Sequence, residues 1–268
     1  MIQYDKVSST NSIAKQLAVL RGDIAVVMAS SQTSGRGRNG RVWESRNDLG
    51  LWISIVIEPE LELGKMSALS FVVANAVTSM LREKFGVDAE IKWPNDVLVK
   101  GRKICGVLTE TSKGASGKTR IILGVGINVG HQENDFSPEL NATSLSIELA
   151  QQANQANQAE PATPAEPATP AIPASTLTPE RLLPILMERF EKEYGIFISE
   201  CQASGHSETI VRHWLAHNRT VGRKVEFEFD GQLKVGDAVG VTREGHLIIN
   251  TADGSFVKVS SGEVKELL

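Results

Sequence analysis

Three arginines and three glycines lie close together in SGRGRNGRVW, which runs from Ser34 to Trp43. Guanidinium groups give directional, multi-donor hydrogen bonds to phosphate and carboxylate oxygens. The glycines allow such a loop to fold tightly around a ligand and to open without it. The stretch therefore predicts a loop that closes over an anion, although an arginine run alone is also typical of an ordinary solvated turn.

The same stretch fits the spacing G-x-G-x-x-G of dinucleotide-binding turns. Such a turn needs a strand before it and a helix after it, so that the pyrophosphate rests on the helix N-terminus. Here a strand-like run precedes the loop, but RVWESRNDLG and another strand-like run follow it. The triplet Gly117–Thr119 is not a P-loop either, because Ser112 stands where the first glycine is needed. Both nucleotide motifs are rejected.

A second polar group lies in KWPNDVLVKGRKICGVLTE, residues 92–110. The WPND segment predicts a rigid turn that enters a strand, and the Lys-Gly pair that follows predicts a hairpin. Lys103 then begins the return strand, and Gly106 permits close backbone approach. Lys103 could bind a carboxylate or phosphate, or be an exposed hairpin lysine. Asp96 could bind magnesium or form an Asx turn.

Composition excludes some classes of function. The chain has 268 residues and a formal net charge of -4, whereas nucleic-acid-binding proteins usually carry a basic surplus. Cys105 and Cys201 have neither metal-site nor redox spacing, and Cys105 is expected to be a buried thiol. No signal-peptide pattern and no run of about 18 apolar residues is present. We expect a cytoplasmic protein without a membrane partner.

The periodicity of the first 150 residues mixes helices and strands. Helices are expected from Ser9, Thr10 or Asn11 to Gly22, and from Lys65 to Gly86. Strands are expected in IAVVMAS, GLWISIVIE, EIKW, VLVK, KICGVLTET and TRIILGVGINV. The two types do not alternate strictly, so the sequence predicts an α+β fold with a mixed or largely antiparallel sheet.

The second half divides into three parts. Residues 151–176, with two AEPATP units, predict a disordered or semi-extended insertion. Helices are expected from Thr178 and around Trp214. From residue 218, short strand-like runs separated by Asp-Gly and Glu-Gly turns predict a small β-barrel or sandwich. We therefore expect a main domain over 1–217 and a small domain over 218–268.

These residues together resemble the biotin protein ligases, that is biotin–[acetyl-CoA-carboxylase] ligases. The resemblance rests on SSTN at 8–11, QTSGRGRNGRVW at 32–43, the 92–110 stretch, GVGINV at 124–129 and SGEV at 261–264. It implies a mixed-sheet catalytic domain followed by an SH3-like β-barrel. Because the chain begins almost at SSTN, the monofunctional type without an N-terminal helix-turn-helix is expected. The Ala/Pro/Thr-rich insertion is not part of the family pattern.

The resemblance implies a reaction in two halves. Biotin attacks the α-phosphate of MgATP to give biotinyl-5'-AMP and pyrophosphate. One lysine of a biotin carboxyl carrier protein then attacks the anhydride and releases AMP. We therefore expect biotin and ATP as substrates, Mg²⁺ bound with ATP, no DNA partner, and a monomer or homodimer.

The resemblance also carries residue roles onto this chain. The catalytic residues would be Lys103, Arg36 and Arg38. The biotin site would comprise Ser9, Thr10, Asn11, Gln32, Gly35, Arg36, Gly37, Arg38, Lys103 and Gly106. The ATP site would comprise Arg38, Arg41, Trp43, Lys92, Asn95 and Asn128, with Asp96 as a magnesium ligand.

Three other functions fit parts of the pattern. A lipoate protein ligase has a related fold and parallel chemistry, but lacks the arginine-glycine loop in this form. A nucleic-acid-binding module could use the basic loop with Trp43, but the acidic net charge argues against it. A biotin-binding scaffold without catalysis is disfavoured because Arg36, Arg38 and Lys103 are all present.

Overall fold

The computed structural model describes residues 1–20, 25–46, 48–59, 67–114, 117–158 and 177–267. The expected helix stop at Gly22, the expected start of the second helix at Lys65 and residues 159–176 of the insertion lie outside the described residues. The described elements are, in chain order, β1 (Ile2–Val7), α1 (Thr10–Leu20), β2 (Val26–Gln32), η1 (Arg38–Gly40), β3 (Gly50–Ile57), α2 (Ser67–Phe85), β4 (Ala89–Lys92), β5 (Asp96–Val99), β6 (Arg102–Lys113), β7 (Thr119–Asn128), η3 (Glu133–Asp135), α3 (Leu145–Gln158), α4 (Pro179–Ser204), α5 (Glu208–Ala216), β8 (Lys224–Phe229), β9 (Gln232–Val241), β10 (Leu247–Thr251), β11 (Phe256–Val259) and β12 (Val264–Glu266).

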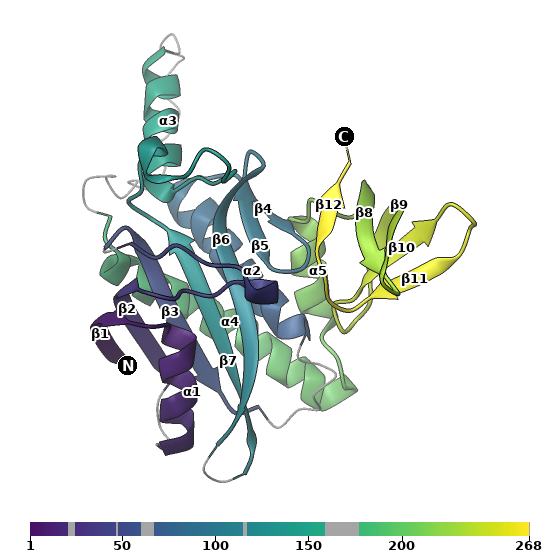
Figure 1. Ribbon diagram of the computed structural model, residues 1–268, viewed down its shortest axis with the longest axis horizontal. Coiled ribbons are helices and arrows are strands. Elements are labelled where there is room, and N and C mark those ends of the chain that lie inside the picture. Colours follow the sequence, from purple (N-terminus) through teal and green to yellow (C-terminus); the bar gives the residue numbers. More distant parts are fainter. Residues whose placement is uncertain (21–24, 47, 60–66, 115–116, 159–176, 268) are drawn as a thin grey trace.

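A seven-stranded sheet with the order β1-β2-β3-β7-β6-β5-β4 forms the centre of the molecule (Figure 1). Only β1 and β2 run parallel, and every other neighbouring pair is antiparallel. This confirms the expected mixed, largely antiparallel sheet and the α+β class. The strand β1 was not predicted, because only Val7 is buried in it and an exposed edge strand lacks a clear apolar pattern.

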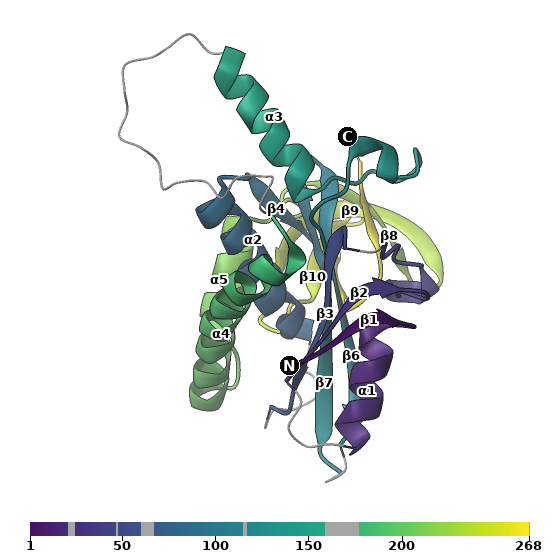
Figure 2. The same cartoon turned by 90° about the vertical axis from the view of Figure 1, so that its left-hand side faces the viewer.

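Helices cover both faces of this sheet (Figure 2). On one face lie α2, α4 and α5, and α2 is buried along nearly its whole length, which explains its apolar composition. It ends at Gly86, whose φ of 65° is the left-handed conformation that commonly terminates a helix. On the opposite face, α1 packs its small side chains Ala14 and Ala18 against the sheet. Beside α1, a cavity lies over the first half of β6 and the last half of β7.

The C-terminal residues form a separate antiparallel sheet with the order β11-β10-β9-β8-β12. Trp93, from the WPND turn of the main sheet, is buried against it. The Trp93 backbone N–H donates to Oγ1 of Thr220 (3.0 Å), and its indole N–H donates to the carbonyl oxygen of Gly245 (2.9 Å). These bonds fix the small sheet beside the β4–β5 turn. The short strand β12, which begins at the last residue of the SGEV segment, was not predicted as a strand.

One expectation for the insertion is wrong. Residues 151–158 were predicted to be disordered or extended, but they continue α3 as a helix. Alanine and glutamine have high helix propensity, so the helix can extend after its buried first turns without an apolar stripe. Two hydrogen bonds hold its middle: Lys100 donates to Gln151 (3.0 Å), and Gln152 donates to the carbonyl oxygen of Gly86 (2.9 Å).

Among the helices that the structure describes, none is both long enough and apolar enough to span a membrane.

Candidate active site

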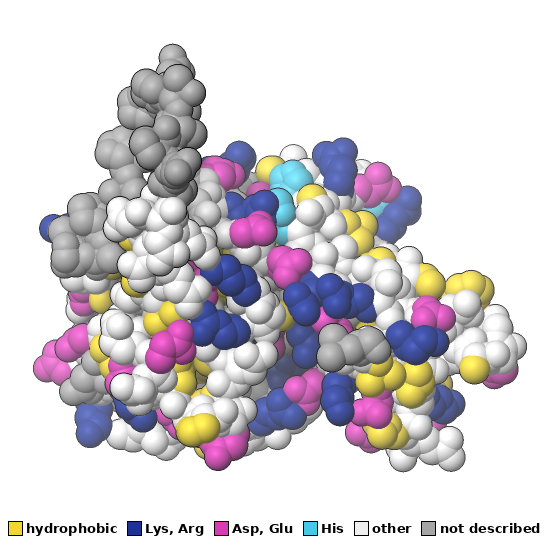
Figure 3. All heavy atoms as spheres, turned by 90° about the horizontal axis from the view of Figure 1, so that it is seen from above, with side chains coloured by type: hydrophobic (Ala, Val, Ile, Leu, Met, Phe, Trp, Pro, Cys, Tyr) yellow, Lys and Arg dark blue, Asp and Glu magenta, His cyan; other side chains and the backbone are white. Residues whose placement is uncertain are grey.

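A cavity of about 480 Å³ opens above the sheet, and almost all of the predicted site residues line it. The arginine-glycine loop covers it from one side, the β5–β6 hairpin contributes Lys103, and the start of α1 closes its far end. Seen from above, basic and acidic side chains lie interspersed across the middle of the molecule (Figure 3). The predicted residues that line the cavity are Ser9, Thr10, Asn11, Gln32, Arg36, Gly37, Arg38, Arg41, Trp43, Lys92, Asn95, Asp96, Lys103, Gly106 and Asn128.

Gly35 is the predicted site residue that does not line the cavity. It is buried under the loop, and a Cβ atom there would lie 2.2 Å from the carbonyl oxygen of Trp43. The backbone N–H of Trp43 donates to the carbonyl oxygen of Gly35 (2.9 Å). Glycine at this position therefore allows the two ends of the loop to approach each other.

The arginines of the loop are held by polar groups from three different elements. Arg36 donates to Glu110 on β6 (3.0 Å), and Arg38 donates to Oδ1 of Asn95 in the WPND turn (3.3 Å). Arg41 forms a bidentate ion pair with Glu263, just before β12. Burial lowers the pKa of Arg38 from its ordinary value, an effect that the charges of Asp96 and Glu263 partly offset. The loop thus places three guanidinium groups around one cavity.

Lys103 reaches the cavity from the β5–β6 hairpin. The expected hairpin is confirmed, and the φ angles of Lys100 (50°) and Gly101 (79°) fit its tight two-residue turn. Nζ of Lys103 lies 2.7 Å from Oδ1 of Asp96 and 5.1 Å from the centre of the Trp43 ring. Lys103 is therefore directed into the cavity and is not an exposed hairpin lysine.

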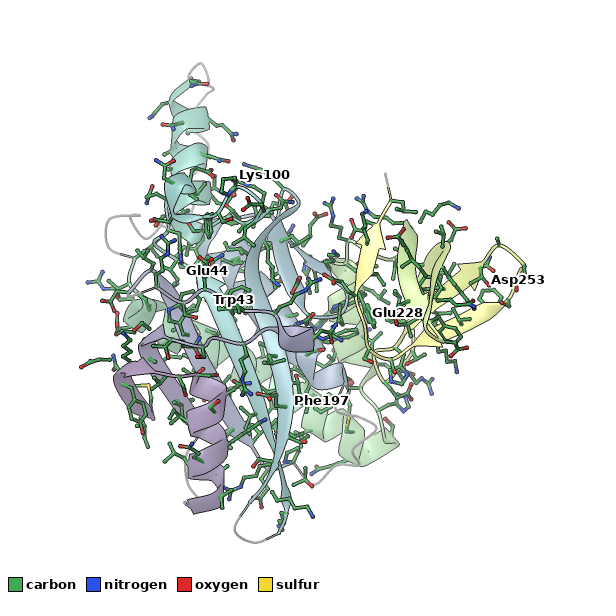
Figure 4. All side chains as sticks on the ribbon, viewed as in Figure 1. Trp43, Glu44, Lys100, Phe197, Glu228 and Asp253 are labelled. Carbon is green, nitrogen blue, oxygen red and sulfur yellow. The ribbon has the colours of Figure 1, made fainter. Side chains whose placement is uncertain are left out.

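Trp43 lies across the two central strands (Figure 4). Its ring contacts the backbone at two glycines: a Cβ at Gly126 would lie 2.6 Å from the Trp43 Nε1 atom, and one at Gly106 would lie 3.0 Å from the ring. The buried indole N–H of Trp43 has no hydrogen-bond partner among the residues that the structure describes. Glycines at 106 and 126 thus provide a flat floor on which the tryptophan lies.

The far end of the cavity is polar and tightly bonded. The Thr10 backbone N–H donates to Oε1 of Gln32 (2.8 Å), and Ser54 donates from its hydroxyl to Oδ1 of Asn11 (2.5 Å). Ser9, Thr10 and Asn11 are all buried at the first turn of α1. Such hydroxyl and amide groups can satisfy a buried polar ring on a ligand.

Comparisons with known proteins agree with this geometry. The model of the biotin/lipoate A/B protein ligase family matches residues 6–128, and the model of the biotin protein ligase C terminal domain matches residues 220–265. The bifunctional ligase/repressor BirA of Bacillus subtilis is 30% identical over 269 residues, which cover 99% of this chain and 73% of that protein. The chain belongs to the biotin protein ligase family.

Other members of the biotin protein ligase family match over almost their full length. The biotin--[acetyl-CoA-carboxylase] ligase of Mycobacterium tuberculosis is 29% identical over 276 residues, covering 99% of this chain and 89% of that protein. The biotin protein ligase of Aquifex aeolicus in complex with biotin and ATP has a TM-score of 0.72 at 24% identity, covering 99% of this chain and 97% of that chain. The expected ligase class and the two-part fold are confirmed.

Three residues in or beside the cavity were not predicted from the sequence: His131 and Phe136 line it, and Glu110 lines a neighbouring cavity. Glu110 accepts from Asn11 (2.7 Å), Lys15 (2.6 Å) and Arg36. Burial alone would raise the pKa of Glu110, but these hydrogen bonds and the charge of Arg36 outweigh burial and lower the pKa. His131 and Phe136 stack 5.0 Å apart in a wall formed by residues 130–142, and burial lowers the pKa of His131. Only Glu110 lay inside a quoted motif.

The side chains that line the cavity show how the expected magnesium ion could be bound. No group of three His, Cys, Asp or Glu side chains in the described ranges could hold a metal. Asp96 lines the cavity as a carboxylate that is paired with Lys103. Mg²⁺ typically binds through one or two carboxylates, several waters and substrate phosphates. The residues therefore fit a magnesium ion that arrives with a triphosphate, and not one held in a protein cage.

Proposed function

We propose that this chain is an ATP-dependent biotin protein ligase that works in two steps. A carboxylate oxygen of biotin attacks the α-phosphorus of ATP, which forms biotinyl-5'-AMP and expels pyrophosphate. The amine nitrogen of a carrier lysine then attacks the acyl carbon, AMP leaves, and the amine loses a proton. The relative from Mycobacterium tuberculosis is named for this acceptor class, the acetyl-CoA carboxylase.

The observation that carries the proposal is that one cavity joins a polar pocket to the three loop arginines and Lys103. Ser9, Thr10 and Asn11 lie at one end, and the arginine loop and Lys103 lie over the rest. The first step brings two anions together, so positioning and charge neutralisation are the main requirements of catalysis. The cavity is arranged to supply both.

We assign biotin to the end of the cavity beside α1. Ser9, Thr10, Asn11 and Gln32 would bind its ureido ring, and Gly37 and Gly106 would let the backbone approach it. Gly35 would contribute indirectly, by allowing the loop to close on itself. Arg36, Arg38 and Lys103 would hold the reacting carboxylate and α-phosphate oxygens and stabilise the charge that develops between them. These three are the proposed catalytic residues.

We assign ATP to the other end. Arg38 and Arg41 would bind its phosphates, Trp43 and Asn128 would lie beside the adenine, and Lys92 and Asn95 would complete the site. A bound magnesium ion would supply charge neutralisation at the phosphates, and Asp96 is its candidate protein ligand. Closure of the loop would keep water from the reactive anhydride.

The second step needs a place for the carrier, and we propose the free edge of β6. This strand has twelve residues and β5 has four, so β5 pairs with β6 only as far as Gly106. A second cavity of about 490 Å³ follows this edge and shares Asn95 and Val107 with the first. Because alternate residues of a strand face the same edge, the backbone groups of Thr109 and Thr111 could pair with an extended carrier segment.

The proposal is tested by transfer of labelled biotin to a biotin carboxyl carrier domain in the presence of ATP, with labelled lipoate in a parallel reaction. We expect biotin on one carrier lysine and no lipoate transfer. Transfer of lipoate without transfer of biotin would show that the chain is a lipoate protein ligase instead. Thr111→Pro, which removes one edge N–H, should lower biotin transfer but leave adenylate formation intact.

We also propose the boundary near residue 217 as the division between a catalytic domain and a small β-barrel domain. The match to the C-terminal family domain begins at residue 220 and supports this division. The barrel would contribute Glu263 to the cavity and hold the WPND turn through Trp93.

A further inference from the structure

A buried carboxylate lies directly behind the hairpin that carries Lys103. Glu148, on α3, is 1% exposed. Its Oε1 atom accepts from the Thr143 hydroxyl (2.6 Å) and from Nη2 of Arg102 (2.8 Å), and its Oε2 atom lies 3.4 Å from Nζ of Lys100. In Figure 4, Lys100 lies at the tip of the hairpin beside the foot of α3. No role proposed above uses this carboxylate.

The partners of Glu148 lie on both sides of the Lys103 backbone. The backbone N–H of Lys103 donates to the carbonyl oxygen of Asn141 (2.8 Å), and the backbone N–H of Thr143 donates to the carbonyl oxygen of Lys103 (2.9 Å). These bonds form an isolated parallel bridge between Lys103 and Ala142. Glu148 thus bonds the residue just before Lys103 and the residue just after Ala142, which are the flanks of this bridge.

The same network reaches the wall of the cavity. Arg102 also pairs with Glu133 of η3 (2.8 Å), next to Asp135 and Phe136, which line the cavity. Asn128, a proposed ATP-site residue, donates to the carbonyl oxygen of Thr143 (3.0 Å). A shift of the Thr143 segment relative to the hairpin would therefore move Lys103 and one wall of the nucleotide site together.

We propose that Glu148 is a positioning residue for the adenylation step. It touches no substrate, and it holds the bridge that sets the place of Lys103 in the cavity. A buried carboxylate that binds two cations and a hydroxyl has a defined geometry, because leaving any of these groups unpaired inside the protein is costly. Misplacement of a catalytic group by about 1 Å can lower a rate by about 100-fold. The inference rests on the proposed ligase activity, and it adds a residue distant from the substrates.

The test compares Glu148→Gln with Glu133→Gln, which removes the exposed partner of the same arginine. Each variant is assayed for biotin-dependent ATP–pyrophosphate exchange at a temperature where circular dichroism shows it folded. We expect Glu148→Gln to lower kcat by about 10- to 100-fold while the KM for biotin stays within about 2-fold. Glu133→Gln should keep both constants within about 2-fold. Equal kcat values for the two variants would overturn the proposal.

A double variant that combines Glu148→Gln with Lys103→Ala distinguishes a positioning role from a purely structural one. If Glu148 acts through Lys103, Glu148→Gln should lower the residual exchange of the Lys103→Ala enzyme by less than about 3-fold. The same 10- to 100-fold loss in both backgrounds would show that Glu148 acts otherwise. If Glu148→Gln does not fold, Thr143→Val replaces it. That change removes only the hydroxyl bond to Glu148, and normal exchange in it would overturn the proposal.

Amide hydrogen exchange gives a readout that does not depend on catalysis. In Glu148→Gln, peptides containing Lys103 and Thr143 should exchange at least about 10-fold faster than in the wild type, because their mutual hydrogen bonds open more often. Glu133→Gln should leave these peptides protected. Unchanged amide protection in Glu148→Gln would contradict the proposal, even if the chain proved to have a different activity. A wild-type enzyme without biotin-dependent ATP–pyrophosphate exchange would refute only the proposed function.

Discussion

Nζ of Lys103 lies 2.7 Å from Oδ1 of Asp96, at the point where the β5–β6 hairpin enters the cavity. The two residues lie on the paired strands β5 and β6. Asp96 is the register partner of Gly106, which is three residues after Lys103 in the chain. The ion pair holds the lysine extended towards the arginine-glycine loop. A carboxylate or phosphate that enters the cavity would meet an ammonium group already in place.

Replacing Lys103 by alanine should lower biotin-dependent pyrophosphate exchange by at least about 100-fold, because a preorganised charge in an active site typically contributes a few kcal/mol to the transition state. The melting temperature should change little, since the side chain is one-third exposed. Lys113→Ala, at the far end of the same strand, is the control. Near-normal exchange in folded Lys103→Ala would remove this residue from the mechanism.

Substitutions at two glycines of β7 should affect the binding of biotin and of ATP separately. A Cβ at Gly124 would lie 2.3 Å from Oδ1 of Asn11, and a Cβ at Gly126 would lie 2.6 Å from Nε1 of Trp43. We expect Gly124→Ala to raise the KM for biotin by about 10-fold and Gly126→Ala to raise the KM for ATP by a similar factor. A 10-fold change corresponds to a loss of roughly 1.4 kcal/mol of binding free energy. Steady-state exchange kinetics measure both constants. An equal effect of each variant on both substrates would contradict the assignment of the two ends.

Glu110 should make the stability of the protein depend on pH in the acid range. Its folded-state pKa is lowered, so it lies below the ordinary glutamic acid value of about 4.3. The ionised group therefore contributes its full stability above that value, and this contribution is lost as the pH falls through the folded-state pKa. Glu110→Gln should lower the free energy of unfolding by roughly 1–3 kcal/mol at pH 7, and the difference from the wild type should shrink in acid. Urea unfolding at several pH values measures this, and a difference that does not vary with pH would refute it.

The arginine-glycine loop should become resistant to trypsin when the adenylate forms. The side chains of Arg36, Arg41 and Arg46 are 41%, 66% and 52% exposed, so they offer cleavage sites in the free enzyme. An anion in the cavity would bind the guanidinium groups and offset the entropy of ordering the loop. Limited trypsinolysis with mass mapping should show strong protection with biotin plus MgATP and little with ATP alone. Equal cleavage under all conditions would show that the loop does not close on the adenylate.

The sequence predicted the elements whose local patterns are strong. The apolar face of α2 and its glycine stop, the Lys100–Gly101 turn and the strand-like runs of the main sheet were all expected and found. The strand β1 was missed because an edge strand with one buried residue has no clear period, and the end of α3 was mistaken for disorder because Gln and Ala form helices without an apolar face.

Of the residues in and around the cavity, some could be predicted from the sequence and others could not. Residues inside a compact motif, such as Arg36, Arg38 and Lys103, could be selected from type and spacing. Glu148, behind the cavity, and His131, in its wall, could not be selected, because each has a partner far away in the sequence that only the fold brings close. Local sequence carries no signal for such long-range ion pairs and ring contacts.

Biotin-dependent exchange of labelled pyrophosphate into ATP tests the central claim most directly, because it needs no carrier protein. The purified chain should incorporate label only when biotin and Mg²⁺ are both present, and replacing biotin by lipoate should abolish the exchange. Folded protein that shows no exchange with biotin, or equal exchange with and without it, would contradict the account.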